Sequence, residues 1–283
     1  RALRGQGKHA EAEEIHRNVL TIQQRVLGPE HPDALESMHD LARELCALNK
    51  RKEAEPLIRK LVEIRQQKTG IDHPQTLQYM RELAYVLHRQ GQYEEAEQIN
   101  RTLLAAWERI RGAGYPETLD AQHALAYVLF EQEKYEEAEK LARNELKLRA
   151  QAQGKEHPDT LEALNLLAGI FRDQGRYALA GQYYQQIIRV REQALGAEHS
   201  DTLAVRYQLA LVLYNQRAYL KAEKLFRQIL KTQQRVLGDS HPDTLKTMGT
   251  LASVLRARNR GKEADQLDRQ ILELHAKKQN HAD

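Results

Sequence analysis

The chain has 283 residues, and its 43 lysines and arginines nearly balance its 40 aspartates and glutamates, which leaves a formal net charge of +3. This balance argues against a dedicated nucleic-acid-binding protein, because such proteins carry clustered positive charge. The single cysteine, Cys46, argues against a disulfide framework or a multi-cysteine metal site. No apolar run approaches the roughly 18 residues of a membrane span. We therefore expect a cytoplasmic protein with no membrane or nucleic-acid partner.

One motif recurs along the chain at an interval of 42 residues, and its fourth copy reads Gly-Lys-Glu-His-Pro-Asp-Thr-Leu over 154–161. Its histidine, or the residue in its place, lies at His31, His73, Tyr115, His157, His199 and His241. A fixed period of this size indicates stacked supersecondary units. We predict one array over 1–283, with a partial repeat at 1–28, full repeats at 29–70, 71–112, 113–154, 155–196, 197–238 and 239–280, and a tail at 281–283. Because Arg1 lies within a repeat, we expect a part of a larger protein.

Each repeat divides into two amphipathic segments, which in the fourth repeat predict helices over 158–173 and 177–195. Pro158 suits a first helical position, since a missing N–H costs nothing there, and Asp159 suits the positive end of the helix dipole. The recurring glycine, Gly196 in this repeat, is expected to end the second helix in a left-handed conformation. A lone second helix over 8–27 should precede six hairpins, and the last helix should fray over 277–281.

Small residues recur at matching places in both helices. A Leu-Ala pair marks each first helix, as Leu167-Ala168 does in the fourth repeat, and an alanine such as Ala180 marks each second helix. Small residues let two antiparallel helices cross closely while leucines fill the space beside them. A single hairpin cannot bury both of its apolar faces, so the hairpins must stack. The sequence therefore predicts an all-α solenoid of antiparallel helical hairpins.

This pattern resembles the tetratricopeptide repeat family, in which a leucine and a small residue also mark the first helix and an alanine the second. That family has an ordinary period of 34. The 42-residue period, Gly-x-x-His-Pro-Asp-Thr-Leu and Glu-Ala-Glu are similar to the longer repeats of kinesin light chains. The resemblance implies a right-handed superhelix whose concave surface is lined by the first helices.

Packing leaves one stripe of each first helix unused, and there polar and aromatic residues replace leucine and alanine. Arginine and tyrosine are favoured at binding hot spots. The candidate peptide-binding residues on this stripe are His39, Arg43, Arg81, Tyr85, His88, Arg89, His123, Tyr127, Phe130, Asn165, Arg172, Tyr207, Tyr214, Asn215 and Arg256. In kinesin light chains the matching stripe holds asparagines and basic residues. Asn165 retains that asparagine, whereas His39, Arg81, His123, Tyr207 and Gly249 depart from it.

The stripe predicts a non-catalytic scaffold that binds an extended peptide or protein segment. The arginines of the first three full repeats should contact acidic residues of this ligand. Tyr207, Leu211 and Tyr214 make the fifth repeat more apolar, so an apolar or aromatic ligand side chain is expected there. The ligand could also be another domain of the same parent protein.

No catalytic, metal or cofactor site is predicted. The sequence contains no phosphate-binding Gly-x-x-x-x-Gly-Lys-Ser/Thr loop, no Gly-x-Ser-x-Gly elbow and no His-Glu-x-x-His helix. The repeated histidines should lie about a helix spacing apart, which is too far to share an ion. Four tyrosines that also repeat, such as Tyr177, are expected to pack at the hairpin turns. Cys46 is expected to be a small buried thiol. The Glu-Ala-Glu carboxylates are expected to form a solvated surface, paired with a lysine or arginine one turn on.

Two other functions remain open. The array could be the sensor or autoinhibitory segment of a signalling ATPase, in which case the full-length protein would contain a phosphate-binding loop. Stacked helical hairpins can also read RNA bases one by one. The near-zero charge balance and the 42-residue period count against the RNA-binding alternative.

Overall fold

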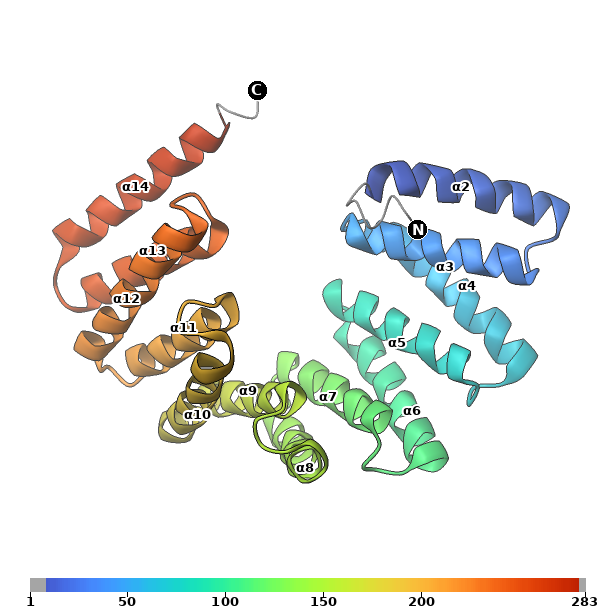
Figure 1. Ribbon diagram of the computed structural model, residues 1–283, viewed down its shortest axis with the longest axis horizontal. Helices are drawn as coiled ribbons and strands as arrows, with labels where there is room; N and C mark the ends of the chain where they lie inside the picture. The colour runs from blue at the N-terminus through green and yellow to red at the C-terminus, as the bar shows by residue number, and fades with distance from the viewer. Residues whose placement is uncertain (1–8, 280–283) are drawn as a thin grey trace. The chain divides into compact units, whose positions relative to one another are not determined.

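The computed structural model describes residues 9–279. In this range the chain forms thirteen α-helices and no β-strand. They fall into two compact units, residues 1–152 and 153–283 (Figure 1). The first unit contains α2 (His9–Val26), α3 (Pro32–Ala47), α4 (Arg51–Thr69), α5 (Pro74–Arg89), α6 (Tyr93–Arg111), α7 (Pro116–Glu131) and α8 (Tyr135–Gln153). The second contains α9 (Pro158–Asp173), α10 (Tyr177–Leu195), α11 (Ser200–Asn215), α12 (Tyr219–Leu237), α13 (Pro242–Ala257) and α14 (Gly261–Gln279).

These bounds confirm the predicted helical hairpins. The odd-numbered helices α3 to α13 are the first helices of the repeats, here called A helices, and the even-numbered ones are B helices. The helices expected over 158–173 and 177–195 are α9 and α10. Helix α14 continues to Gln279, and fraying over 277–281 stays a prediction, with 280–281 outside the described residues. The predicted parts at 1–8 and 281–283 lie outside the described residues, and the single solenoid across both units stays a prediction.

The motif histidine caps the A helix. His31, His73, His157, His199 and His241 have extended backbone with ψ of 134–142°, and each Nδ1 accepts a hydrogen bond of 3.2–3.3 Å from the backbone N–H two residues on. This bond satisfies one of the N–H groups that a helix start leaves unpaired. Tyr115 occupies the same place before α7 without a side-chain cap. The structural role predicted for the repeated histidines is therefore confirmed at these five positions.

The glycine before each A helix adopts a backbone conformation other than the expected one. Gly70, Gly112, Gly196 and Gly238 combine φ of +82 to +95° with ψ of 160–169°. This region is accessible essentially to glycine alone and differs from the left-handed helical region. The glycine carbonyl then accepts a bond of 2.8–2.9 Å from the motif threonine in five repeats. The extended ψ differs from a left-handed cap, which corrects the sequence-based expectation.

The left-handed conformation instead occurs at the turn between each A helix and its B helix. Gly91 and Gly175 occupy this position in two repeats, and Asn49, Glu133, Arg217 and Asn259 adopt φ of 60–61° in the others. The next residue donates its N–H to a carbonyl five residues earlier, at 2.7–2.9 Å in all six turns. This closure is a Schellman motif, which satisfies carbonyls at the end of the A helix.

Small residues allow close packing within each unit, as predicted. The alanines of the Leu-Ala pairs and those of the B helices are almost fully buried, for example Ala168 on α9 and Ala180 on α10. In the first unit, consecutive helices from α2 to α7 are in contact, and α8 joins through side-chain bonds to α7. In the second unit, consecutive helices from α9 to α14 are in contact. Apolar clusters fill the space between the layers of both units.

The outer faces of the B helices carry an ion-pair ladder. Arg59 of α4 binds Glu55 one turn earlier at 2.8 Å and Glu95 on the next B helix at 2.5 Å. Arg101 of α6 repeats this arrangement with two other glutamates. The predicted pairing of the Glu-Ala-Glu carboxylates with a basic residue one turn on is confirmed at Glu55 and Glu97. Two other glutamates of the B helices, Glu145 and Glu223, are almost fully buried and also pair with arginines.

Candidate functional site

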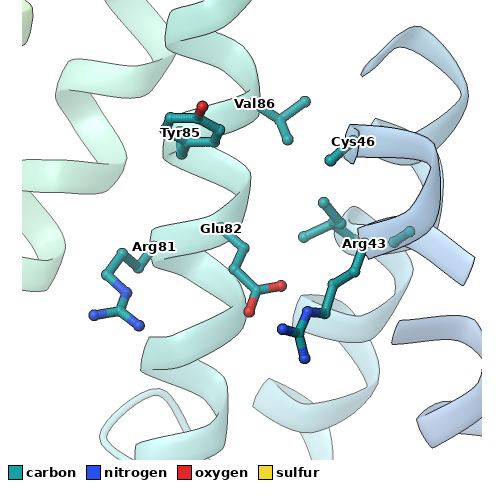
Figure 2. Close-up of a pocket in the computed structure, with 8 residues that line it drawn as sticks. Arg43, Cys46, Arg81, Glu82, Tyr85 and Val86 are labelled. Atoms are coloured by element: carbon teal, nitrogen blue, oxygen red, sulfur yellow. The ribbon is translucent and has the colours of Figure 1, made fainter. Parts of the chain in front are cut away.

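Two cavities lie in the first unit beside A helices that carry the predicted stripe. The first cavity, of about 410 Å³, is lined by Ala42, Arg43, Cys46, Ile58, Arg81, Glu82, Tyr85 and Val86. Figure 2 shows Arg43 and Cys46 projecting from α3 and Tyr85 from α5. The B helix α4 contributes Ile58 as an apolar lining residue. This cavity therefore combines an apolar lining with a charged rim.

The second cavity lies one repeat further along the chain, beside α5 and α7. It measures about 330 Å³ and is lined by Arg81, Ala84, Tyr85, His88, Arg89, Asn100, His123, Ala124, Tyr127 and Val128. Helices α5 and α7 supply most of these residues, and the B helix α6 supplies Asn100. Arg81 and Tyr85 line both cavities. Because the Tyr85 side chain is 56% exposed, it is accessible to a ligand that spans the two cavities.

The first cavity has a mixed charge. His39 Nε2 lies 2.8 Å from a Glu82 carboxylate oxygen, and Figure 2 shows that carboxylate pointing toward Arg43. Burial alone would raise the pKa of Glu82, but the bond to His39, with Gln78 and the charge of Arg43, lowers it overall. His39 is therefore engaged with Glu82, and Arg43 and Arg81 provide the positive rim of this cavity.

The second cavity has an aromatic wall. The His88 ring lies 5.2 Å from the ring of Tyr127 and 5.6 Å from that of Tyr93, between ring centroids. Phe130 packs against Tyr127 at 6.2 Å and against Tyr135 at 6.1 Å. Burial lowers the pKa of His88 and raises that of Tyr127. The wall thus combines a neutral imidazole with protonated phenols at neutral pH, and Tyr93 and Tyr135 pack near the hairpin turns as predicted.

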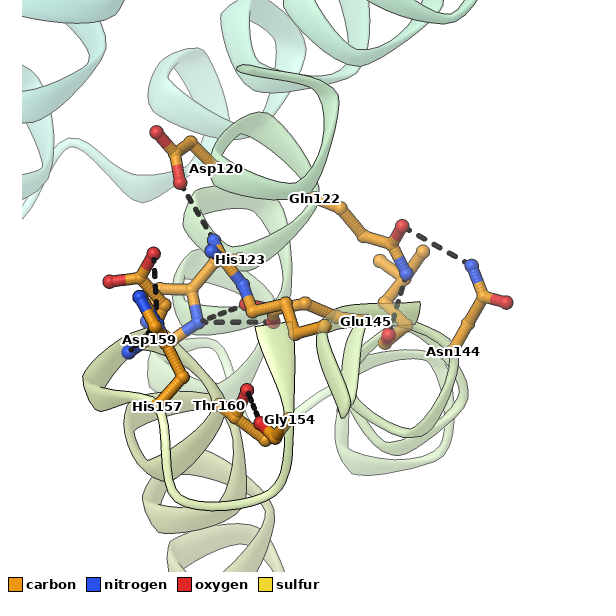
Figure 3. A network of polar contacts seen from close by, with 11 residues as sticks. Asp120, Gln122, His123, Asn144, Glu145, Gly154, His157, Asp159 and Thr160 are labelled. Carbon is orange, nitrogen blue, oxygen red and sulfur yellow. Dashed lines mark hydrogen bonds and ion pairs between the residues drawn. The ribbon is translucent and has the colours of Figure 1, made fainter. Parts of the chain in front are cut away.

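His123 takes part in a polar network between α7 and α8 (Figure 3). Its Nδ1 lies 3.0 Å from an oxygen of Glu145, whose side chain is 0% exposed. Arg149 Nε binds the same glutamate at 2.8 Å, and its Nη2 binds Asp120 at 2.7 Å. His123 therefore borders the second cavity while its Nδ1 also contacts a buried carboxylate.

The predicted residues of the second unit have varied environments. Tyr207 is only 9% exposed, because it packs against Phe226 at 5.4 Å and its hydroxyl lies 2.8 Å from Thr250 Oγ1. The expectation that packing leaves this position unused was wrong. Tyr214 packs against Tyr219 at the hairpin turn. The remaining positions are the half-buried Asn165, Arg172 in contact with Asp173 and Gln208, the exposed Asn215, and Arg256 in contact with Asp265 and Asp268.

The cavity residues that the sequence reasoning missed include Glu82, Ile58 and Asn100. Glu82 belongs to the same helix as the stripe, but its partner His39 is on another repeat. Ile58 and Asn100 lie on B helices, at equivalent positions 42 residues apart, and each lines one cavity. A comparison of that position across the full repeats would have marked Asn100 together with Asp268, because Ile58, Ala142, Tyr184 and Phe226 occupy it elsewhere.

Among the described residues, no group of three or more histidine, cysteine, aspartate or glutamate side chains could hold a metal ion. Cys46 is half-buried against the apolar cluster, and burial raises the pKa of its thiol. A thiol of this kind is a poor nucleophile at neutral pH. No helix in the described part of the chain is long and apolar enough to cross a membrane.

Comparison with known proteins identifies one repeat family along most of the chain. The family model described as Tetratricopeptide repeat matches residues 1–67, 45–109, 75–151, 117–193, 159–216 and 201–277. A search of curated proteins gave no match. A crystal structure of a putative kinesin light chain with nearly identical TPR-like repeats, from Podosopora anserina, is similar at a TM-score of 0.65 and 26% identity. The similarity covers 73% of this chain and 98% of that chain.

Two further solved structures resemble the chain in fold. BtubC (BKLC) from P. vanneervenii has a TM-score of 0.63 at 17% identity, with 82% of this chain and 90% of that chain covered. A tetratricopeptide repeat protein from Parabacteroides merdae has a TM-score of 0.69 at 15% identity, with 96% and 89% covered. Their low identity makes them evidence of a shared fold.

Proposed function

Because the chain belongs to the tetratricopeptide repeat family, with repeats of the kinesin-light-chain kind, we propose that it is a non-catalytic scaffold that binds an extended segment of a partner protein along α3, α5 and α7. Repeats of this family support protein interaction in general. The observation that carries the finer proposal is the pair of cavities that share Tyr85. A cytoplasmic location belongs to the same proposal.

The dimensions of the two cavities favour an extended ligand. The axes of neighbouring packed helices are roughly 10 Å apart. An extended chain advances about 3.3 Å per residue. Two ligand side chains about three residues apart could therefore occupy successive cavities, with the intervening residues over Tyr85. Each cavity offers apolar lining atoms, such as those of Val86 in the first and Val128 in the second.

The charged rim favours acidic residues beside these anchors. Arg43, Arg81 and Arg89 are exposed at the cavities, and an arginine can hold a carboxylate through two parallel hydrogen bonds. The buried state of Tyr207 moves the expected apolar contact from the fifth repeat to the first unit. The proposed ligand thus carries apolar or aromatic anchors flanked by carboxylates.

The test begins with selection of binders from a displayed library of random peptides. Selected peptides are then measured by fluorescence anisotropy against the chain and against Arg81→Ala with Tyr85→Ala. We expect the double variant to weaken binding by about 2 kcal/mol or more, roughly thirtyfold, if these residues are hot spots. Circular dichroism should stay unchanged, because both side chains are exposed.

The control changes Glu95 and Glu137 to glutamine on the outer face of the B helices. Each carboxylate pairs with an arginine of the preceding B helix and lies outside both cavities. Peptide binding should be unaffected by this change. Full binding by the cavity variant, with loss in the outer-face variant, would instead assign the function to the convex surface.

A further inference from the structure

The two cavities share eight equivalent positions and differ chemically at five of them. Residues 42 apart in sequence occupy the same place in successive repeats. At one such position the first cavity has Ile58 and the second has Asn100. At another, the first cavity has Cys46 and the second has His88. At these two positions the second cavity presents polar side chains where the first presents apolar or weakly polar ones. At the other three, Arg43, Arg81 and Glu82 of the first cavity are replaced by Tyr85, His123 and Ala124.

Asn100 is buried, with its side chain 2% exposed, and its side-chain oxygen Oδ1 has no hydrogen-bond partner. The equivalent Ile58, Ala142 and Phe226 bury a side chain that needs none. A buried amide without partners destabilises the fold, because it loses water and gains nothing in return. Rotation of the amide by half a turn exchanges Oδ1 and Nδ2, so the group can offer either an acceptor or a donor.

His88 adds a second unpartnered atom at the same cavity. Its Nε2 is buried without a hydrogen-bond partner, and the ring is held between Tyr93 and Tyr127. Burial lowers the pKa of His88, so the imidazole is neutral at pH 7 and each ring nitrogen is either a donor or an acceptor, depending on the tautomer. Asn100 and His88 together can supply one acceptor and one donor.

We propose that the second cavity binds a tyrosine side chain of the partner and recognises its hydroxyl through Asn100 and His88, whereas the first cavity accepts a purely apolar side chain. This inference rests on the proposed function. A phenol hydroxyl donates one hydrogen bond and accepts another, so it can satisfy both residues. A phenylalanine ring would satisfy neither, and an indole N–H can only donate.

The walls of the second cavity suit a flat ring. Tyr85 and Tyr127 supply aromatic faces and edges, against which a ligand ring can pack in offset or edge-to-face geometry. Arg81 and Arg89 lie at the same cavity and can hold a carboxylate adjacent to the ring in the ligand. These arginines disfavour a cationic ligand side chain.

The experiment compares matched peptides that differ by one oxygen atom. Peptides selected from the displayed library are resynthesised with each tyrosine replaced by phenylalanine. Their affinities for the chain and for the Asn100→Leu variant are then measured by anisotropy. We expect the phenylalanine peptide to bind the chain about tenfold more weakly, as for loss of a hydrogen bond to a buried group. The variant should discriminate less between the two peptides, because only His88 remains to bind the hydroxyl.

Ile58→Leu provides the control, since it changes the equivalent position of the first cavity without altering polarity. The tyrosine preference should persist in this variant. Selected peptides without tyrosine, or phenylalanine peptides that bind the chain as tightly as the tyrosine ones, would overturn the inference. If such peptides still lose affinity for the Arg81→Ala, Tyr85→Ala variant, the proposed function stands. Unchanged affinity for that variant would refute the proposed function itself.

Discussion

Two hairpins fill the same positions of the repeat with opposite chemistry. In α7–α8, His123 and Glu145 form part of a buried polar network with Arg149. Two repeats later, in α11–α12, the equivalent positions hold Tyr207 and Ile229 within an apolar cluster. Leucine or isoleucine replaces the glutamate in most other repeats. The position of Glu145 and Ile229 can therefore hold either an apolar side chain or a polar one whose hydrogen-bonding atoms are paired. A charge is tolerated there when its partners lie on the same hairpin.

Truncation of a side chain in the apolar cluster of α11–α12 should have the largest effect on stability. Phe226→Ala removes a fully buried ring that packs against Tyr207, and we expect a loss of about 3–5 kcal/mol in the free energy of unfolding. Urea denaturation followed by circular dichroism measures it. The exposed Leu220 on the same helix provides the control, because Leu220→Ala should change stability by less than about 0.5 kcal/mol. A similar small loss for both variants would contradict the assigned core.

The polar version can be broken by removing its carboxylate. Glu145→Leu leaves Arg149 and His123 beside an apolar side chain, and we expect a loss of about 3 kcal/mol, because a buried cation loses an ion-pair partner. Adding Arg149→Leu should recover at least half of that loss, since it removes the buried cation that lost its partner. The same urea titration compares the two variants. If the double variant is less stable than the single one, the network does not act as a compensated unit.

A third variant tests whether the unpaired amide oxygen of Asn100 destabilises the fold. Asn100→Leu should raise the free energy of unfolding by about 1–2 kcal/mol, because it removes a buried amide without a hydrogen-bond partner at Oδ1. Thermal melting measures the gain. The matched change at the exposed Asn215 should give no increase. A lower melting temperature for Asn100→Leu would mean that the amide is satisfied in solution.

The smallest expected effect concerns Glu82 and pH. Its pKa is lowered in the folded protein, so its contribution to stability is present above the unfolded pKa and is lost as the pH falls through the folded pKa. Glu82→Gln should therefore cost about 0.5–1 kcal/mol at pH 6 and much less at pH 3. Denaturation at both pH values measures the difference. A constant difference between the chain and the variant would show that His39 does not stabilise the carboxylate.

Much of the fold was predictable because its signals are local. Each A helix begins at a motif whose bonds close within a few residues, such as His157 to Asp159 and Thr160 to Gly154. The helix bounds of the fourth repeat follow from these contacts alone. The helical period also placed Arg81 and Tyr85 on an exposed face. The conformation of the glycine before each A helix was predicted incorrectly. A recurring glycine indicates a positive φ, but its ψ depends on the hydrogen bond from the motif threonine.

The candidate site was less predictable because its contacts join different helices. Tyr207 is buried through Phe226 and Thr250, which lie on two other helices. Glu145 reads as a surface carboxylate until His123 and Arg149 are seen around it. The polarity of Asn100 matters only because the residue lines a cavity with α5 and α7. Periodicity identifies equivalent positions, but the side chains of neighbouring layers decide which of them are accessible.

The self-contained junction before each A helix has a consequence for how such a chain can change its length. Every bond that shapes the junction, from the glycine carbonyl to the histidine cap, lies within a single stretch of eight residues. A duplication or deletion of 42 residues with its breakpoints at two glycines would rebuild the same junction from the same atoms. Only the interfaces between newly adjacent helices would have to adapt. Arrays of this type can therefore gain or lose binding surface in whole repeats during evolution, without new loops.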